Sequence, residues 1–256
     1  MANNYIFDSH AHYDDKRFDS VREDLLANMP KNRVGGIINC GTDIDTSLFS
    51  IKLAEQFPFV FAAVGYHPGE IDESTDFDTD KLTTFAKHNK AVAIGEIGLD
   101  YYWDTTYKDK QILFFEKQLE LAKELDLPVI IHDREAHGDT LEILKKHKPK
   151  GVLHCFSGSI EMAREIIKLG LYIGVGGVVT FKNSKKLVEI VKEIPLQRIL
   201  LETDAPYLAP EPHRGKTNNS AYILHVAEKI AEIKGITTDE VLEITTNNCK
   251  ELFKIK

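Results

Sequence analysis

The chain has 256 residues, with 32 Lys and Arg against 40 Asp and Glu, which gives a formal net charge of −8. This acidic balance argues against broad, sequence-independent wrapping of nucleic acid, which needs many Lys and Arg side chains to neutralise phosphates. Small substrates, or only the end of a polymer, fit this charge better. Hydrophobic residues at 43% and charged residues at 28% are ordinary for a globular protein. At this length we expect one domain over residues 1–256.

Eight short apolar runs, rich in β-branched residues and bounded by turn signals, predict β-strands. They lie at residues 5–12, 35–41, 59–68, 91–100, 128–133, 151–156, 171–180 and 199–206. The segments between them have helical spacing, and Ile112, Phe115 and Leu119 form one apolar stripe of this kind. Two or three further helices are expected over residues 218–254.

Strands that alternate with helices indicate a parallel sheet that is buried on both faces. Eight such units predict an α/β fold, a single (β/α)8 TIM-type barrel with extra C-terminal helices, and an open doubly wound sheet is the alternative. In a barrel, reactive residues are expected at the carboxyl ends of the strands. Polar residues gather at or near these ends, namely His10, His12, His67, Glu96, His132, Asp133, His154, Glu202 and Asp204.

The pair His10-x-His12 lies at the end of the first predicted strand, where residues two apart point to the same side. Two imidazoles suit one divalent ion such as Zn²⁺ or Mn²⁺, although two partly solvated histidines would give the same pattern. The flanking Asp8 and Asp14 are interpreted as supporting or solvated carboxylates. Glu96 lies in an apolar strand, where an unpaired carboxylate is costly, so a metal ligand that could bridge two ions is favoured.

His132 and His154 each follow apolar residues near the ends of adjacent predicted strands. Singly, each could be a core histidine bonded to a backbone carbonyl, but their joint appearance favours a shared ion. Four histidines with one glutamate and one aspartate provide enough ligands for two divalent ions, such as Mg²⁺, Mn²⁺ or Zn²⁺. A binuclear centre of this kind predicts hydrolysis by an activated water.

Asp204 closes the eighth predicted strand, and the Ala205-Pro206 pair after it is expected to keep the chain extended and to hold this carboxylate at the rim. Glu202 lies two residues earlier, on the same side of the strand. It is either a supporting group next to the ligands or a structural carboxylate.

Three further positions are candidates for substrate contact. His67 could hydrogen-bond a substrate or serve as a turn residue before Pro68. Arg214, in the loop after the last strand, could bind phosphate, and a solvated basic loop is the alternative. Trp103 follows Tyr102 and could stack on a base or pack at the rim.

Three cysteines, Cys40, Cys155 and Cys249, are widely spaced and form no C-x-x-C pair. This spacing argues against a disulfide framework or a zinc ribbon and favours a reducing compartment. The first residues lack a leader pattern and no run reaches the length of a membrane span. We therefore expect a cytoplasmic protein with no membrane contact and no obligate protein partner.

Six phrases, taken in order, resemble the TatD family of metal-dependent deoxyribonucleases and hydrolases. They are "FDSHAH", "GYHPGE", "IGEIGLDYYW", "PVIIHDR", "GVLHCFSGS" and "LLETDAPYLAPEPHRGKTNNS", and they run through essentially the whole chain. The resemblance implies a distorted TIM barrel related to the amidohydrolases. It also implies divalent-metal-dependent hydrolysis of DNA, often exonucleolytic, with DNA or DNA fragments bound by their 3′ or 5′ ends.

The resemblance also implies two sets of metal ligands. One ion would be held by His10, His12, Glu96 and Asp204, and the other by Glu96, His132 and His154. In the resulting hypothesis Glu96 and Asp204 are the catalytic residues, Asp204 orients or deprotonates the attacking water, and Arg214 and His67 bind phosphate oxygens. The alternatives are a small-molecule amide or ester hydrolase of the amidohydrolase group and, less favoured, a non-catalytic metal-binding protein.

Overall fold

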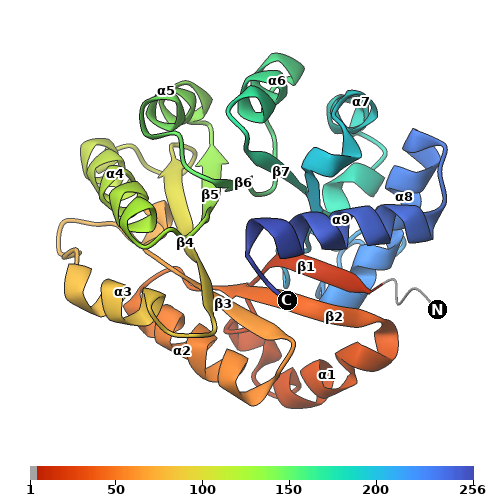
Figure 1. Cartoon of the computed structure of the whole chain (residues 1–256), viewed down its shortest axis with the longest axis horizontal. Helices are drawn as coiled ribbons and strands as arrows, with labels where there is room; N and C mark the ends of the chain where they lie inside the picture. Colours follow the sequence, from red (N-terminus) through yellow and green to blue (C-terminus); the bar gives the residue numbers. More distant parts are fainter. Residues whose placement is uncertain (1–4) are drawn as a thin grey trace.

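The computed structural model describes residues 5–256. All eight predicted strands are present and form one sheet in chain order, β1 to β8, in which every neighbouring pair is parallel. Helices surround the strands on the outside (Figure 1), which is the architecture of a TIM-type barrel and excludes the open doubly wound sheet. The strands are β1 Ile6–Ala11, β2 Val34–Cys40, β3 Val60–Val64, β4 Ala91–Asp100, β5 Val129–Arg134, β6 Gly151–Leu153, β7 Tyr172–Val175 and β8 Ile199–Leu201.

Each strand is followed by a helix, and two helices follow β8 as expected. They are α1 Arg22–Asn28, α2 Ile44–Gln56, α3 Thr79–Ala86, α4 Lys108–Glu124, α5 His137–His147, α6 Ile160–Lys168, α7 Lys185–Glu193, α8 Ile223–Lys234 and α9 Thr238–Leu252. Short 3-10 helices are η1 Lys16–Phe18, η2 Met29–Asn32, η3 Pro68–Glu70, η4 Gly177–Thr180, η5 Leu196–Arg198 and η6 Ser220–Tyr222. None of the helices in residues 5–256 is long and apolar enough to cross a membrane.

Four strands end three or more residues earlier than the sequence predicted. The third ends at Val64 because Pro68, which has no N–H for a sheet ladder, begins η3. The seventh ends at Val175, and residues 177–180 form η4 in place of the predicted strand. The sixth and eighth end at Leu153 and Leu201. Only after the seventh strand does the apolar run continue, through Val178 and Val179, past the point where the backbone leaves the sheet.

The barrel closes where β1 meets β8. The Ser9 hydroxyl donates to the carbonyl of Leu201 at 3.0 Å, and the N–H of Asp204 donates to the carbonyl of His10 at 2.9 Å. One residue pair further on, the N–H of His12 donates to the carbonyl of Ala205 at 2.7 Å. These bonds lie at the carboxyl ends of both strands, so the hydrogen bonds that close the barrel also position His10, His12 and Asp204.

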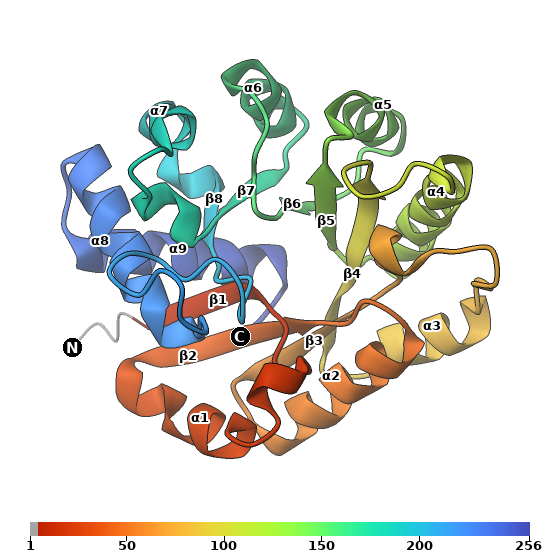
Figure 2. The same cartoon turned by 180° about the vertical axis from the view of Figure 1, so that it is seen from behind.

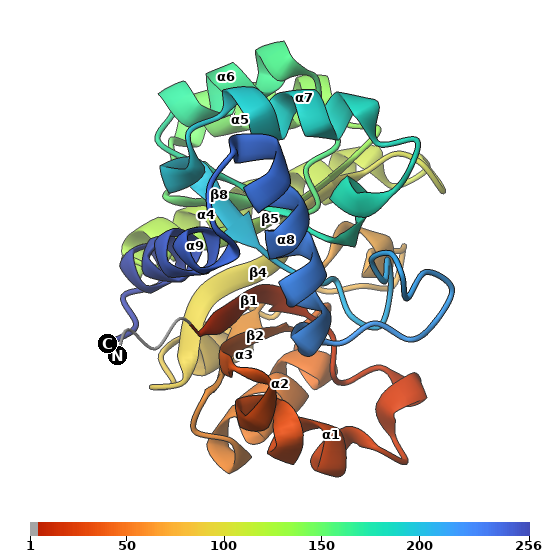
Figure 3. The ribbon, with the colours of Figure 1, turned by 90° about the vertical axis from the view of Figure 1, so that its right-hand side faces the viewer.

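Helix α9 lies across the opposite, amino-terminal end of the barrel (Figure 3). The Asn248 side-chain amide donates to the carbonyls of Leu196 and Ile199, both at 2.9 Å, just before and at the start of β8. Cys249 and Phe253 pack into a buried cluster with side chains from all eight strands. This cluster is the floor of the barrel, and the carboxyl ends of the strands open on the face seen in Figure 2.

Candidate metal centre

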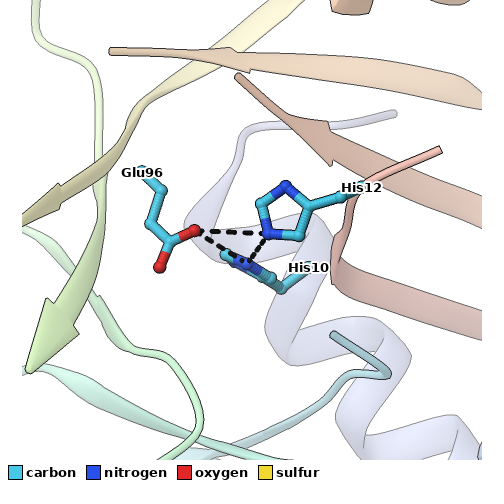
Figure 4. Close-up of side chains that lie close together, drawn as sticks. All are labelled: His10, His12 and Glu96. Carbon is cyan, nitrogen blue, oxygen red and sulfur yellow. Dashed lines mark hydrogen bonds and ion pairs between the residues drawn. The ribbon is translucent and has the colours of Figure 1, made fainter. Parts of the chain in front are cut away.

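Two histidines from the first strand region face one oxygen of Glu96 (Figure 4). The Nε2 atoms of His10 and His12 lie 3.2 and 3.3 Å from Glu96 Oε2, and they lie 2.9 Å from each other. Asp204 Oδ1 is 3.7 Å from His10 Nε2 and 3.6 Å from His12 Nε2. The structure therefore brings together the four residues that were predicted to hold one ion.

The other oxygen of Glu96 faces a second pair of histidines. His132 Nδ1 lies 2.8 Å and His154 Nε2 lies 2.7 Å from Glu96 Oε1, and the two imidazole nitrogens are 3.3 Å apart. The carboxylate of Glu96 is 3% exposed, so neither oxygen is solvated by bulk water. Its two oxygens thus point to two different sets of donor atoms, which is the geometry that a bridging ligand requires.

The two strands that carry these residues have an extra residue at the site. Between Asp8 and Ala11, β1 advances three residues while β2 advances two, and His10 lies within this stretch. Between Ile94 and Ile97, β4 advances three residues while β5 advances two, and Glu96 lies within this stretch. A bulge of this kind re-aims a side chain without ending the strand. Irregular register in β1 and β4 therefore helps to turn the donors toward one point.

The hydrogen bonds of His12 indicate that its Nε2 presents a lone pair to the cluster. His12 Nδ1 lies 3.0 Å from the carbonyl oxygen of Cys40, which can only accept, so the ring proton is on Nδ1 in the neutral form. The bare Nε2 then faces a carboxylate oxygen and a second imidazole, an arrangement of acceptors that needs a cation between them. The donor set, imidazole nitrogens with carboxylates, suits Zn²⁺, Mn²⁺ or a similar divalent ion.

The carboxylates of the cluster raise the pKa values of two histidines. Burial alone would lower the pKa of His12, but the hydrogen bond and charge of Glu96, with the charge of Asp204, raise it to about 10. Burial opposes the charged form of His132 too, yet its hydrogen bonds to Asp100 and Glu96 raise its pKa to about 9. The cluster therefore attracts positive charge, whether as protons or as metal ions.

Asp100, at the end of β4, supports the centre and was missed by the sequence analysis. Its Oδ2 lies 3.0 Å from His132 Nε2, on the far side of the imidazole from Glu96. A carboxylate in this position fixes the orientation of the ring and makes the other nitrogen a stronger ligand. The signal was present, because Asp100 lies four residues after Glu96 and thus on the same side of the strand.

Asp204 reaches the cluster from a backbone that is not extended. Its φ of 55° lies in the left-handed region, whereas Ala205, the residue before Pro206 to which the prediction of an extended chain applies, forms a parallel bridge with β1. The chain turns at Asp204 and then runs beside β1, where Ala205 pairs with Ala11. This turn aims the carboxylate inward, and burial raises its pKa.

Glu202 has a structural position beside the centre. Its Oε1 accepts the N–H of Cys155, and its Oε2 lies over Gly174, where a Cβ atom would come within 2.1 Å. Only glycine leaves this space. Burial raises the pKa of Glu202 to about 8. Of the two interpretations left open, the contact with Cys155 makes Glu202 a group that holds the loop after β6 in place.

Asp8 and Asp14, the carboxylates that flank the histidine pair, both have supporting contacts. Asp8 is fully buried and accepts hydrogen bonds from the hydroxyls of Thr203 and Ser220, which ties β1 to the segment after β8. Asp14 accepts the side-chain amide of Asn39 at 3.1 Å. Asp8 is therefore not the solvated carboxylate that one interpretation allowed.

A cleft of about 890 Å³ opens above the centre at the carboxyl end of the barrel. Within residues 5–256 no lysine lines it, and the only arginine that does is Arg134. The lining residues are His12, Asp14, Asp15, Thr42, His67, Gly69, Glu70, Glu96, Asp100, Trp103, His132, Asp133, Arg134, His154, Cys155, Ser157, Asp204, Tyr207 and Leu208.

The residues predicted to touch substrate have separate positions. His67 lines the cleft, and its Nδ1 accepts the N–H of Gly69 at 2.9 Å, so its Nε2 carries the proton and points toward Glu96 Oε1 at 3.5 Å. Arg214 does not line the cleft, and its guanidinium lies over the ring of Phe181, 4.3 Å from the centroid. The structure thus brings His67 to the centre and leaves Arg214 outside it.

The comparison with protein families matches nearly the whole chain. The model of the family described as TatD related DNase matches residues 7–254. Among curated proteins, the metal-dependent hydrolase YabD of Bacillus subtilis, itself uncharacterised, is 44% identical over 253 residues, which cover 98% of this chain and 99% of that protein. The uncharacterised metal-dependent hydrolase YcfH of Escherichia coli is 37% identical over 257 residues, which cover 98% and 96%.

A solved structure has the same fold throughout. The TatD homologue YjjV of Escherichia coli superposes with a TM-score of 0.92 and 33% identity, and the alignment covers 100% of each chain. This full-length match extends the agreement from the sequence phrases to the path of the whole backbone.

Proposed function

The chain belongs to the family of TatD related DNases and is a metal-dependent hydrolase, and from this premise we propose that it hydrolyses phosphodiester bonds at the ends of DNA. Two divalent ions would be held, one by His10, His12, Glu96 and Asp204 and the other by Glu96, His132 and His154. When bound, such ions lower the pKa of a water molecule and neutralise charge on a phosphoryl group. The remaining steps fall to side chains of this chain.

The carboxylate of Asp204 is the proposed base. It is 19% exposed at the floor of the cleft, so a water can reach it, and its raised pKa suits proton transfer near neutral pH better than that of a solvated aspartate. His67 is the proposed donor to a nonbridging phosphate oxygen, because hydrogen bonding to Gly69 leaves the proton on Nε2. Phosphate binding by Arg214 stays a prediction that needs movement of its loop.

The observation that supports this proposal best is that the two carboxylate oxygens of Glu96 face two different pairs of histidines. A carboxylate whose oxygens lie 2.7 to 3.3 Å from four imidazole nitrogens can hold two ions side by side. Paired ions suit displacement at phosphorus, since they stabilise both the attacking and the leaving oxygen. Many binuclear amidohydrolases use a carboxylated lysine for this bridge, and no lysine lines the cleft within residues 5–256.

The acidic character of the chain supports attack at an end rather than along a duplex. The net charge is −8, and the acidic side chains Asp14, Asp15, Glu70 and Asp133 line the cleft. A long polyanion lying across this surface would be repelled, whereas one or two terminal nucleotides can enter and be neutralised by the bound ions.

The test is hydrolysis of a substrate panel by metal-reconstituted protein. The panel contains single-stranded DNA labelled at either end, bis-p-nitrophenyl phosphate and a set of N-acyl amino acids, and Asp204→Asn is the control. We expect both phosphodiesters to be hydrolysed, the labelled strand to be shortened from one end, and the variant to lose activity. Turnover of the amides alone would overturn the proposal and assign an amidohydrolase function.

A further inference from the structure

An aromatic and cationic cluster stands at the rim of the cleft, on the loop after β4. Trp103 is 76% exposed and Tyr102 is 53% exposed, which is unusual for large aromatic rings, and Trp103 lines the cleft. The two rings meet edge to face, with centroids 4.8 Å apart. Arg134, at the end of β5, covers Tyr102 with its guanidinium carbon 3.9 Å from the ring centroid and 5.3 Å from that of Trp103.

This cluster, which we call the Trp103 platform, is fixed to the metal centre by short contacts. The N–H of Tyr102 donates to Asp100 Oδ1 at 2.9 Å, and Asp100 Oδ2 lies 3.0 Å from His132 Nε2. The N–H of Tyr101 donates to the carbonyl of Arg134 at 2.9 Å. One aspartate therefore both contacts a predicted ligand histidine and anchors the platform, so the platform is held in a fixed position relative to His132.

A second stacked pair of an arginine and a tyrosine lies across the cleft, but its arginine is neutralised by a carboxylate. Arg17 lies over the ring of Tyr207 at 4.2 Å, but Asp15 binds its guanidinium through two oxygens, at 2.9 and 2.8 Å. Arg134 forms no ion pair in the described part of the chain, so its N–H groups are available to an anion. Because β1 and β8 are neighbours and β4 and β5 lie opposite them in the barrel, the available cation is on one side only.

We propose that the Trp103 platform stacks an unpaired nucleobase of the substrate while Arg134 contacts an adjacent phosphate. This assignment rests on the proposed function, that is, on nucleic acid as substrate. An exposed indole face gains energy by stacking on any base, and a guanidinium offers paired N–H donors to phosphate oxygens. A base within a duplex already has both faces covered, so the platform selects single strands or frayed ends without reading their sequence.

Trp103 is the only tryptophan among the 256 residues, so its fluorescence reports on this site alone. Full-length Asp204→Asn protein, which is expected to lack hydrolytic activity, is titrated in the presence of divalent metal with a single-stranded 12-mer, the blunt duplex of the same sequence, and a strand of the same length built from abasic residues. We expect quenching by the single strand at concentrations where the duplex and the abasic strand have little effect. Equal quenching by the abasic strand, or none by any strand, would overturn stacking.

Kinetics in the wild-type background provide a second readout. Replacing Trp103 by Leu removes the indole at an exposed position, so the fold is retained, and we expect KM for the single strand to rise about tenfold with kcat little changed. Trp103→Phe, which keeps a ring face, should restore most of the affinity. Arg134→Gln should raise KM for the normal and the abasic strand alike. A fall in kcat with KM unchanged in Trp103→Leu would overturn the assignment.

The outcomes separate this inference from the proposed function. If wild-type protein hydrolyses DNA but Trp103 fluorescence does not respond, DNA hydrolysis stands and base stacking falls. If single strands quench Trp103 but no phosphodiester is cleaved, the platform stands as a nucleic-acid site and the nuclease function falls.

Discussion

Replacing Asp100 by Asn tests whether a carboxylate behind His132 tunes the metal centre. Asp100 Oδ2 lies 3.0 Å from His132 Nε2, and the amide keeps the shape and an acceptor while removing the charge. A charged hydrogen bond contributes about 1.5–3 kcal/mol and a neutral one about 0.5–1.5, so the change costs about 1–1.5 kcal/mol. That corresponds to roughly tenfold weaker metal binding, at the lower end of the 10–100-fold losses typical of such positions.

The assay is hydrolytic activity against buffered free metal concentration, run at pH 9 because the pKa of His132 is raised to about 9 and protons compete with the metal below it. The midpoint should move about tenfold higher, with activity at saturating metal largely retained. Asp133→Asn is the matched control, since Asp133 binds His137 at 2.7 Å, a histidine outside the cluster. An unchanged midpoint, or the same shift in both variants, would refute the reasoning.

Three further predictions follow from the site and the floor of the barrel. Glu96→Ala should abolish both metal loading, measured by elemental analysis, and hydrolysis; an active, metal-replete variant would contradict the bridging role. For the metal-free protein, prepared with a chelator, the melting temperature should fall as pH rises from about 6.5 to 10. The folded state raises the pKa values of His12 and His132 to about 10 and 9, so their protonation stabilises the fold fully only below the ordinary histidine pKa. A melting temperature that does not change over this pH range would contradict the prediction. Phe253→Ala should lower the free energy of unfolding in urea by about 3 kcal/mol with metal stoichiometry unchanged, and a loss under about 1 kcal/mol would show that the floor is loosely packed.

The convergence of the ligands was predictable because a parallel barrel gathers all carboxyl ends of its strands at one face. The sequence analysis placed His10, His12, His67, His132 and His154 at or near strand ends, and these five residues surround Glu96. This placement needed only the two-residue periodicity of strands and the position of each histidine within its predicted strand, and local sequence encodes both.

Backbone irregularity was not predictable from the same signals. The extra residues in β1 and β4 leave no trace in the sequence pattern, because these strands are buried along their whole length and so have no alternation of buried and exposed residues that a bulge would interrupt. The left-handed backbone at Asp204 and the path that places Arg214 over Phe181 depend on tertiary contacts of a long loop. Asp100 is different, since strand periodicity from Glu96 would have found it.

The floor of the barrel also has a consequence for the order of folding during synthesis. Asn248 and Phe253 complete the amino-terminal end of a sheet whose first strand begins at Ile6 and whose last ends at Leu201. All eight strands therefore leave the ribosome before the residues that seal them. We expect nascent chains to expose the lower core until α9 has emerged, so that chaperone binding during translation should persist past β8 and end when the final helix docks.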